Sequence, residues 1–193
     1  KPCRECKKKV STEASTCPHC GVPGPTADKS KNILEEIWMH AEQDYEVCEA
    51  TLKYIGAQVD KDSEYRMWSI AIYFYRGLFE ASCMKHKLDK NDYKKAIIYC
   101  FRRGYDIKIY SHLNDQQKDQ FSNQTYADTE VGLRYDDKTG KMCKKIVESG
   151  RNSFQSKEKS SMGEITKLWK DPNINFTESS AKREVGNFFK KLF

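Results

Sequence analysis

The stretch from Cys3 to Cys20, CRECKKKVSTEASTCPHC, decides the fold of the N-terminal part of this 193-residue chain. It holds two Cys-x2-Cys pairs, Cys3 with Cys6 and Cys17 with Cys20, separated by ten residues. Four thiolates at this spacing form the ligand set of a tetrahedral Zn²⁺ ion. The alternatives are two disulfides or four unrelated cysteines. They are disfavoured because paired Cys-x2-Cys segments inside cells usually bind metal, so the sequence predicts one metal site.

Four sulfur ligands leave no open position for water or a substrate, so we expect this zinc to be structural rather than hydrolytic. A unit of about 25 residues cannot bury enough apolar surface to fold alone. The metal would supply its folding free energy, about 10 kcal/mol or more. His19 lies inside the second pair, and we expect it to be a solvent-facing turn residue. Gly21 follows that pair and suits a turn with positive φ.

The same stretch reads C-x2-C-x3-V-S-x2-A-x2-C-P-x-C-G. It resembles the short zinc-ribbon domain found at the ends of many bacterial and phage proteins. The residues that carry the resemblance are Cys3, Cys6, Val10, Ser11, Ala14, Cys17, Pro18, Cys20, Gly21, Pro23 and Pro25. The resemblance implies one structural Zn²⁺ and a bacterial or phage source. It implies no activity, because such ribbons are attached to many unrelated partners, and it does not extend beyond residues 1–25.

The charge of the chain is unevenly distributed. The net charge is +6, with +4 in residues 1–32, −2 in residues 33–150 and +4 in residues 151–193. Basic ends attract nucleic acid or acidic partners, although they are often only solvated. The chain has no apolar run long enough for a transmembrane helix and no leader pattern at its start. Because its cysteines are paired as in zinc sites, the sequence predicts a reducing, cytoplasmic location.

The remainder of the chain predicts a helical domain over residues 33–148, joined to the ribbon by a linker at 26–32. Apolar residues recur at spacings of four and three in a seam formed by Leu34, Trp38, Ala41, Tyr45, Cys48, Leu52 and Ile55. Such a seam indicates a long helix over 33–56. A second apolar helix is expected over 63–86, so the two should form an antiparallel hairpin. A homodimer through helix 33–56 is the alternative.

Further elements are expected after this hairpin. A third helix is predicted over 89–104, a short strand over 107–110 and a marginal polar helix over 113–126. The turn residues 136–140 between two apolar segments predict a β-hairpin over 130–147. Residues 149–163 have the composition of a flexible linker, and C-terminal helices are expected within 164–193. The predicted fold class is therefore mainly α, with a small N-terminal zinc ribbon and one short β-hairpin.

One candidate site is a basic and aromatic surface, which we call the 94–108 surface. Its cations are Lys94, Lys95, Arg102, Arg103 and Lys108, and tyrosines at 99, 105 and 110 alternate with them. These residue types neutralise phosphates and stack on bases. They are also common on solvated faces of helices, which is the competing interpretation. The ribbon adds further cations between its two cysteine pairs.

A second candidate is the C-terminal segment. Val185, Phe188, Phe189, Leu192 and Phe193 recur at helical spacing, and basic residues flank them. Such a helix would dock into a protein groove or lie on an anionic membrane surface. The competing interpretation is that it folds back and completes the core.

Evidence for catalysis is weak. Asp106-x-Lys108 is reminiscent of half of a metal-dependent nuclease site, but no earlier acid is placed on a neighbouring strand. No phosphate-binding loop, nucleophile elbow or zinc-protease motif is present. Catalytic residues are therefore not assigned.

The sequence predicts a non-enzymatic zinc-binding adaptor or regulatory protein that binds a macromolecular partner, protein in preference to nucleic acid. Two alternatives remain open. One is a nucleic-acid-binding protein that uses the ribbon and the 94–108 surface. The other is a small nuclease-type enzyme or toxin-like effector in the helical domain.

Overall fold

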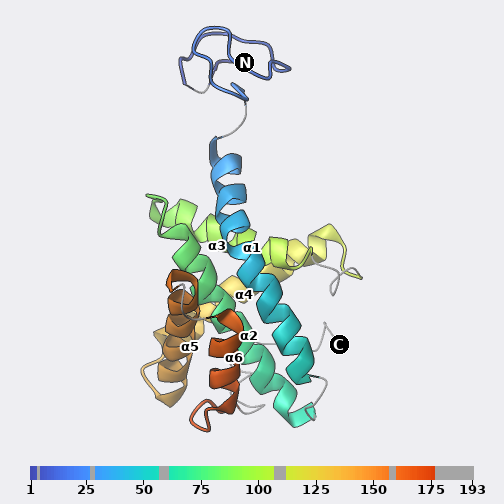
Figure 1. Ribbon diagram of the computed structural model, residues 1–193, viewed down its shortest axis with the longest axis vertical. Coiled ribbons are helices and arrows are strands. Elements are labelled where there is room, and N and C mark those ends of the chain that lie inside the picture. The colour runs from blue at the N-terminus through green and yellow to red at the C-terminus, as the bar shows by residue number, and fades with distance from the viewer. Residues whose placement is uncertain (4, 27–28, 57–60, 107–111, 157–159, 177–193) are drawn as a thin grey trace. The chain divides into compact units, whose positions relative to one another are not determined.

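The computed structural model describes residues 1–3, 5–26, 29–56, 61–106, 112–156 and 160–176 (Figure 1). The chain divides into two compact units, Lys1–Glu36 and Ile37–Phe193. The first contains the cysteine-rich segment, and the second is a helical bundle.

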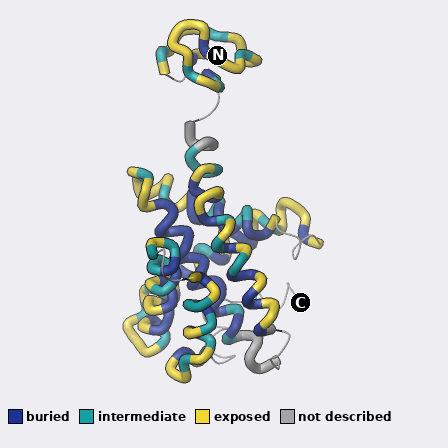
Figure 2. Tube along the Cα trace, viewed as in Figure 1, coloured by how far each residue is buried: buried dark blue, intermediate teal, exposed yellow. Residues whose placement is uncertain are grey.

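The described residues form six helices: α1 (Lys29–Gly56), α2 (Lys61–Cys83), α3 (Lys90–Gly104), α4 (Asp115–Arg134), α5 (Lys138–Gln155) and α6 (Ser161–Lys170). The mainly helical fold class is therefore confirmed. Helix α2 is the centre of the second unit and contacts α3, α4, α5 and α6. All of its residues from 69 to 83 are buried, as the dark blue course through the bundle in Figure 2 shows. A helix buried on every side is a core element, as its apolar sequence indicates.

Helix α1 runs antiparallel to α2. The Ser82 hydroxyl donates a hydrogen bond to the Ile37 carbonyl at 2.6 Å. Further along α1, the Tyr45 ring lies 4.5 Å from that of Tyr75, which precedes Ser82 on α2. The α1 seam from Trp38 onward is buried inside the unit. The seam is thus used within the chain, as the hairpin interpretation expects, and is not left as an exposed face for a coiled-coil dimer.

Two glycines bring the backbones of α2 and α5 into direct contact. A Cβ at Gly77 would lie 1.9 Å from the carbonyl oxygen of Val147, and a Cβ at Gly150 would lie 2.2 Å from that of Phe74. No side chain fits at either distance. This close approach explains why α2 and α5 form the most extensive helix pair in the unit.

The β-hairpin predicted over 130–147 is wrong, because these residues belong to helices α4 and α5. Residues 135–137 connect the two helices, and residues 138–140 form the first turn of α5. The Asp137 side chain accepts a hydrogen bond from the Gly140 N–H at 3.0 Å and so caps α5. Asp and Gly favour turns and helix caps alike, and the sequence pattern does not separate these two uses. The strand expected over 107–110 lies outside the described residues.

The predicted linker over 149–163 is also largely helical. Helix α5 continues to Gln155, and its last turns bury Gly150 and Ser153. Ser160 caps α6, because its hydroxyl accepts a hydrogen bond from the Gly163 N–H at 3.1 Å. Helix α1 begins at Lys29, within the linker predicted over 26–32. Residues 157–159 and 177–193 lie outside the described part of the chain.

We predict that Gly150→Ala destabilises the helical unit by about 2 kcal/mol, because the added methyl group must push α5 away from the α2 backbone. At an ordinary helix position the same change would be stabilising by up to about 1 kcal/mol. Urea unfolding followed by circular dichroism measures the difference.

Gly163→Ala is the matched control, because its Cβ meets only the side-chain oxygen of Ser160, at 3.2 Å. We expect its effect to stay within about 0.5 kcal/mol. A Gly150→Ala variant as stable as the parent would contradict the close contact of α2 and α5.

Candidate functional site

The two Cys-x2-Cys segments have the same backbone hydrogen-bond pattern, fourteen residues apart. In the first, the Cys3 N–H donates to the Lys8 carbonyl at 2.8 Å, and the Lys7 N–H donates to the Cys3 carbonyl at 3.1 Å. The second segment has the equivalent bonds. The Cys17 N–H donates to the Val22 carbonyl at 2.8 Å, and the Gly21 N–H donates to the Cys17 carbonyl at 2.9 Å. Each segment is closed by one antiparallel bridge, Pro2 with Lys9 and Thr16 with Pro23. We call these segments the first and second knuckle.

The equivalence extends to the residue after each second cysteine. Lys7 has φ 61° and Gly21 has φ 75°, so both lie in the left-handed region. Gly21 was expected there from the sequence. Lys7 was not, because nothing in the spacing marks a lysine for a conformation that glycine usually adopts.

The four thiols meet between the knuckles. The sulfur atoms of Cys3, Cys6, Cys17 and Cys20 all lie within 4.8 Å of one another. The Sγ–Sγ distance is 3.8 Å for Cys3 and Cys20, and 3.7 Å for Cys6 and Cys17. Four sulfurs placed about 2.3 Å from a central ion at tetrahedral angles would lie about 3.8 Å apart.

A disulfide would need a sulfur–sulfur distance of about 2.05 Å. All eight cysteines of the chain are free thiols. The predicted cysteine cluster is therefore confirmed, and its sulfur atoms lie close enough together to bind one metal ion. His19 is exposed and is not among the clustered residues, as expected.

The thiols are electrostatically unequal. Desolvation raises the pKa of Cys3, but hydrogen bonds from the backbone of Cys6 and Glu5 outweigh it and lower the pKa to about 6. A backbone hydrogen bond from Val22 lowers the pKa of Cys20, yet desolvation and the neighbouring thiols raise it to about 11. Closely spaced thiolates resist ionising together. A divalent cation at their centre removes this penalty, so the donor set fits a metal ion.

In the 94–108 surface, most of the described cations have partners within the chain. Arg102 is held by three aspartates: it donates to Asp115 and Asp119, each at 2.8 Å, and to Asp106. Asp106 also accepts from Lys118 at 3.0 Å. Arg102 and its partners therefore link the end of α3 to the start of α4.

The other described cations of the 94–108 surface contact several different residues. Arg103 lies 3.8 Å from a carboxylate oxygen of Asp106, and Lys95 lies 2.9 Å from Asp92. The Lys94 ammonium lies 5.6 Å from the centre of the Tyr126 ring. Lys108 lies outside the described residues. Nucleic-acid binding by this surface stays a prediction, and binding there would compete with the aspartates.

The candidates for catalysis and for C-terminal docking lie largely outside the described residues. Lys108 of the Asp106-x-Lys108 triplet, and Val185, Phe188, Phe189, Leu192 and Phe193, are among residues that the structure does not describe. Within the described part of the chain, the cysteine cluster is the one group of three or more His, Cys, Asp or Glu with metal-binding geometry. None of the described helices has the length and apolar character needed to cross a membrane.

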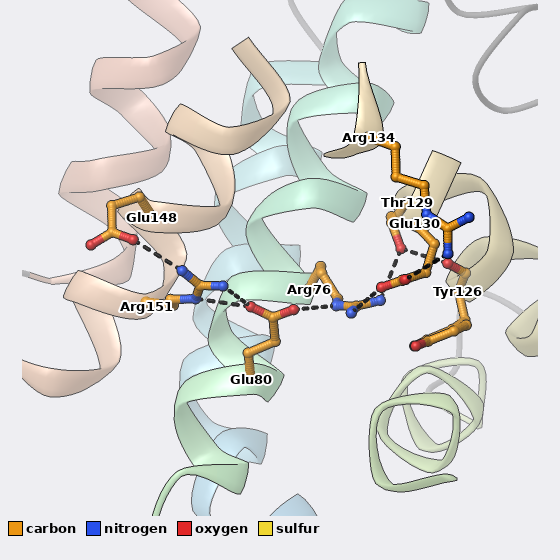
Figure 3. Close-up of polar contacts among 8 residues, drawn as sticks. All are labelled: Arg76, Glu80, Tyr126, Thr129, Glu130, Arg134, Glu148 and Arg151. Atoms are coloured by element: carbon orange, nitrogen blue, oxygen red, sulfur yellow. Dashed lines mark hydrogen bonds and ion pairs between the residues drawn. The ribbon is translucent and has the colours of Figure 1, made fainter. Parts of the chain in front are cut away.

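A buried network of charges crosses the helical unit and was not predicted (Figure 3). At its centre are Arg76 and Glu80 of α2, whose side chains are only 3% and 5% exposed. The Arg76 Nε lies 2.6 Å from a Glu80 oxygen, and its Nη2 lies 2.6 Å from Glu130 of α4. The other Glu80 oxygen accepts from Arg151 of α5 at 2.8 Å. Thr129 and the Tyr126 ring complete the surroundings of Arg76.

This network fastens α2 to α4 and α5. Each buried charge has an opposite charge beside it, so the attraction between them offsets the free-energy cost of removing them from water. Its sequence signal was an arginine and a glutamate four residues apart within the largely apolar stretch 67–83 of α2. The partners on α4 and α5 lie more than 50 residues away, so no local pattern could have identified them.

A cavity of about 590 Å³ lies between the C-terminal half of α1 and α6. It is lined by Ala50, Thr51, Tyr54, Ile55, Met162, Thr166, Trp169 and Lys170. Arg66 fixes its Trp169 wall, because the guanidinium donates to the Trp169 and Asp171 carbonyls at 2.7 and 2.8 Å and lies 4.8 Å from the indole centre. Tyr54 and Met162 are 72% and 54% exposed. We call this feature the α1/α6 groove.

Comparison with protein-family models, with curated proteins and with solved structures gave no match. The geometry of the cysteine cluster and of the helical unit therefore carries the functional argument.

We predict that Glu80→Gln destabilises the helical unit by about 3 kcal/mol, because it leaves two arginines without their shared carboxylate inside the protein. Urea unfolding followed by circular dichroism measures the loss.

Glu148→Gln is the matched control. Its carboxylate also contacts Arg151, at 3.1 Å, but it is 57% exposed, so we expect a change of about 0.5 kcal/mol or less. Equal effects of the two substitutions would contradict a structural role for the buried network.

Proposed function

We propose that this protein is a non-enzymatic zinc-binding adaptor, in which the ribbon is held by one Zn²⁺ and the helical unit binds a protein partner. The observation that carries the proposal is the cluster of four sulfurs from two knuckles, all within 4.8 Å of one another. Tetrahedral sites of four thiolates are typical of zinc, and also of iron. With four protein ligands the coordination sphere is closed, which favours a structural role over Lewis-acid catalysis.

The lining of the α1/α6 groove also favours binding over chemistry. Its described residues include no histidine or carboxylate, the groups that most often act as catalytic acids and bases, and no cysteine nucleophile. Tyrosine, tryptophan and methionine are instead enriched in protein interfaces, where large side chains anchor the partner. An apolar lining suits a protein better than a phosphate backbone. We therefore keep a protein as the preferred partner, and a cytoplasmic location as the setting for eight free thiols.

We expect the purified protein to contain one zinc ion per chain, and Cys17→Ser to lose it. The loss should unfold the ribbon and leave the circular dichroism of the helical unit largely unchanged, because the two units have separate interiors. Elemental analysis gives the metal content and separates zinc from iron, which would also colour the protein.

Cys143→Ala is the control, because this buried thiol of α5 belongs to the helical core. It should keep the metal, whatever it does to the helical unit. Retention of one zinc ion by Cys17→Ser would refute the ligand set.

The groove is tested by adding a charge to it. We predict that Met162→Glu abolishes capture of the partner protein by the tagged, zinc-loaded chain, because the carboxylate cannot be buried against an apolar partner. Because Met162 is exposed, the fold should tolerate the change. Capture is measured after nuclease treatment, so that nucleic acid does not bridge the two proteins.

Met39→Glu is the matched control, since Met39 is 66% exposed on α1 and does not line the groove. It should capture the partner as the parent does. A partner that is captured equally by both variants binds elsewhere, and capture that depends on nucleic acid would favour the alternative function.

A further inference from the structure

The two knuckles have matching backbones but opposite surface chemistry. Superposition of their hydrogen-bond patterns places Lys7, Lys8 and Lys9 of the first knuckle on Gly21, Val22 and Pro23 of the second. All three lysines are exposed. The fold therefore accepts an uncharged sequence at these positions, and the metal geometry does not require the lysines.

Lys7 also occupies a position that costs free energy. At φ 61° a side chain with a Cβ is about 1 kcal/mol less favourable than glycine. The second knuckle avoids this cost with Gly21, whose φ is 75°. A strained residue where a better one is available points to a use of its side chain, either within the chain or toward a ligand. Here that side chain is a cation on the exposed edge of the ribbon.

Charge compensation within the ribbon is the competing explanation. Four thiolates and one divalent cation carry a net charge of −2, which nearby lysines offset. Lys8 and Lys9 can supply this compensation without strain, so the strained Lys7 is not needed for it. Within the described residues, moreover, no carboxylate lies within ion-pair distance of the Lys8 or Lys9 ammonium. Their charges are thus available to an external anion.

The composition of the ribbon decides what kind of anion fits. Residues 1–26 contain no Phe, Trp, Tyr, Leu, Ile or Met. A protein interface here would lack the large apolar or aromatic anchors from which binding energy comes. A phosphate backbone needs no such anchor, because counterion release supplies nearly all of non-specific binding to a duplex. The absence of Phe, Trp and Tyr also makes stacking on unpaired bases a small contribution within this segment.

We propose that Lys7, Lys8 and Lys9 bind the phosphate backbone of a nucleic-acid duplex without reading its sequence. This goes beyond the adaptor function proposed above, because it uses a different unit of the protein. A chain with both properties would bring a protein partner to nucleic acid.

The test uses the full, metal-loaded chain and a mixed-sequence DNA duplex of about 20 base pairs, with affinity measured by fluorescence anisotropy over a range of salt concentrations. We expect the parent to bind with a slope of log K against log salt of about −2.7 or steeper, since each phosphate contact contributes about 0.9. Lys8→Gln/Lys9→Gln should reduce this slope by about 1.8 and should leave the metal content unchanged.

Lys7→Gly separates the two explanations. If the lysine binds phosphate, the variant keeps its metal or holds it more tightly, because strain is removed, yet its slope is reduced by about 0.9. If the lysine only offsets the charge of the thiolates, the variant loses metal more readily and binds the duplex as before. The second result would overturn the proposal.

Lys138→Gln/Lys141→Gln on α5 is the matched control, because both lysines are exposed and the substitution removes the same charge. It should leave the slope unchanged. A slope that is equally reduced in the control, or unchanged in the ribbon variants, would overturn the proposal. Binding to polyglutamate in place of the duplex would overturn it in favour of an acidic protein. None of these results depends on the α1/α6 groove.

Discussion

The contact of the α2 and α5 backbones is the constraint on which the helical unit depends. Gly77 and Gly150 let the two helices approach so closely that no side chain separates them at either point. Helix α2 is then enclosed, and polar groups near the contact cannot reach water. Arg76 and Glu80 lie in this enclosed region, so their charges must be matched from inside the protein. The close contact thus buries these two charges, and the network supplies the opposite charges that they require.

The network in turn determines the arrangement of the neighbouring helices. A buried ion pair is a weak source of net stability, but a misplaced partner leaves an uncompensated charge in the interior. Helix α4 must therefore present Glu130 to Arg76, and α5 must present Arg151 to Glu80. Alternative packings of these amphipathic helices would bury the same apolar surface and lose this match. The charges accordingly serve specificity more than stability.

The sequence was informative where the interaction is local. The cysteine spacing and the seam of α1 were interpreted correctly, because the metal ligands and the helix face repeat over a few residues. The interpretation was wrong at 130–147 and over most of 149–163, where Asp, Gly and Ser act as helix caps and close-contact residues instead of as turns. The partners of Arg76 and Glu80 on α4 and α5 are distant in sequence, and the strain at Lys7 depends on a backbone angle, so no local pattern identified either feature.

The repeat within the ribbon has a kinetic consequence. Each knuckle contributes two of the four sulfurs, so it acts as a bidentate chelate, and an ion can leave by way of a species that only one knuckle still holds. Either knuckle could release the ion first, but the two releases differ in free energy, because the first knuckle carries the strain at Lys7 and the second has a glycine at the equivalent position. Loss of the metal ion should therefore begin at the first knuckle, so that the second knuckle is the last to hold it.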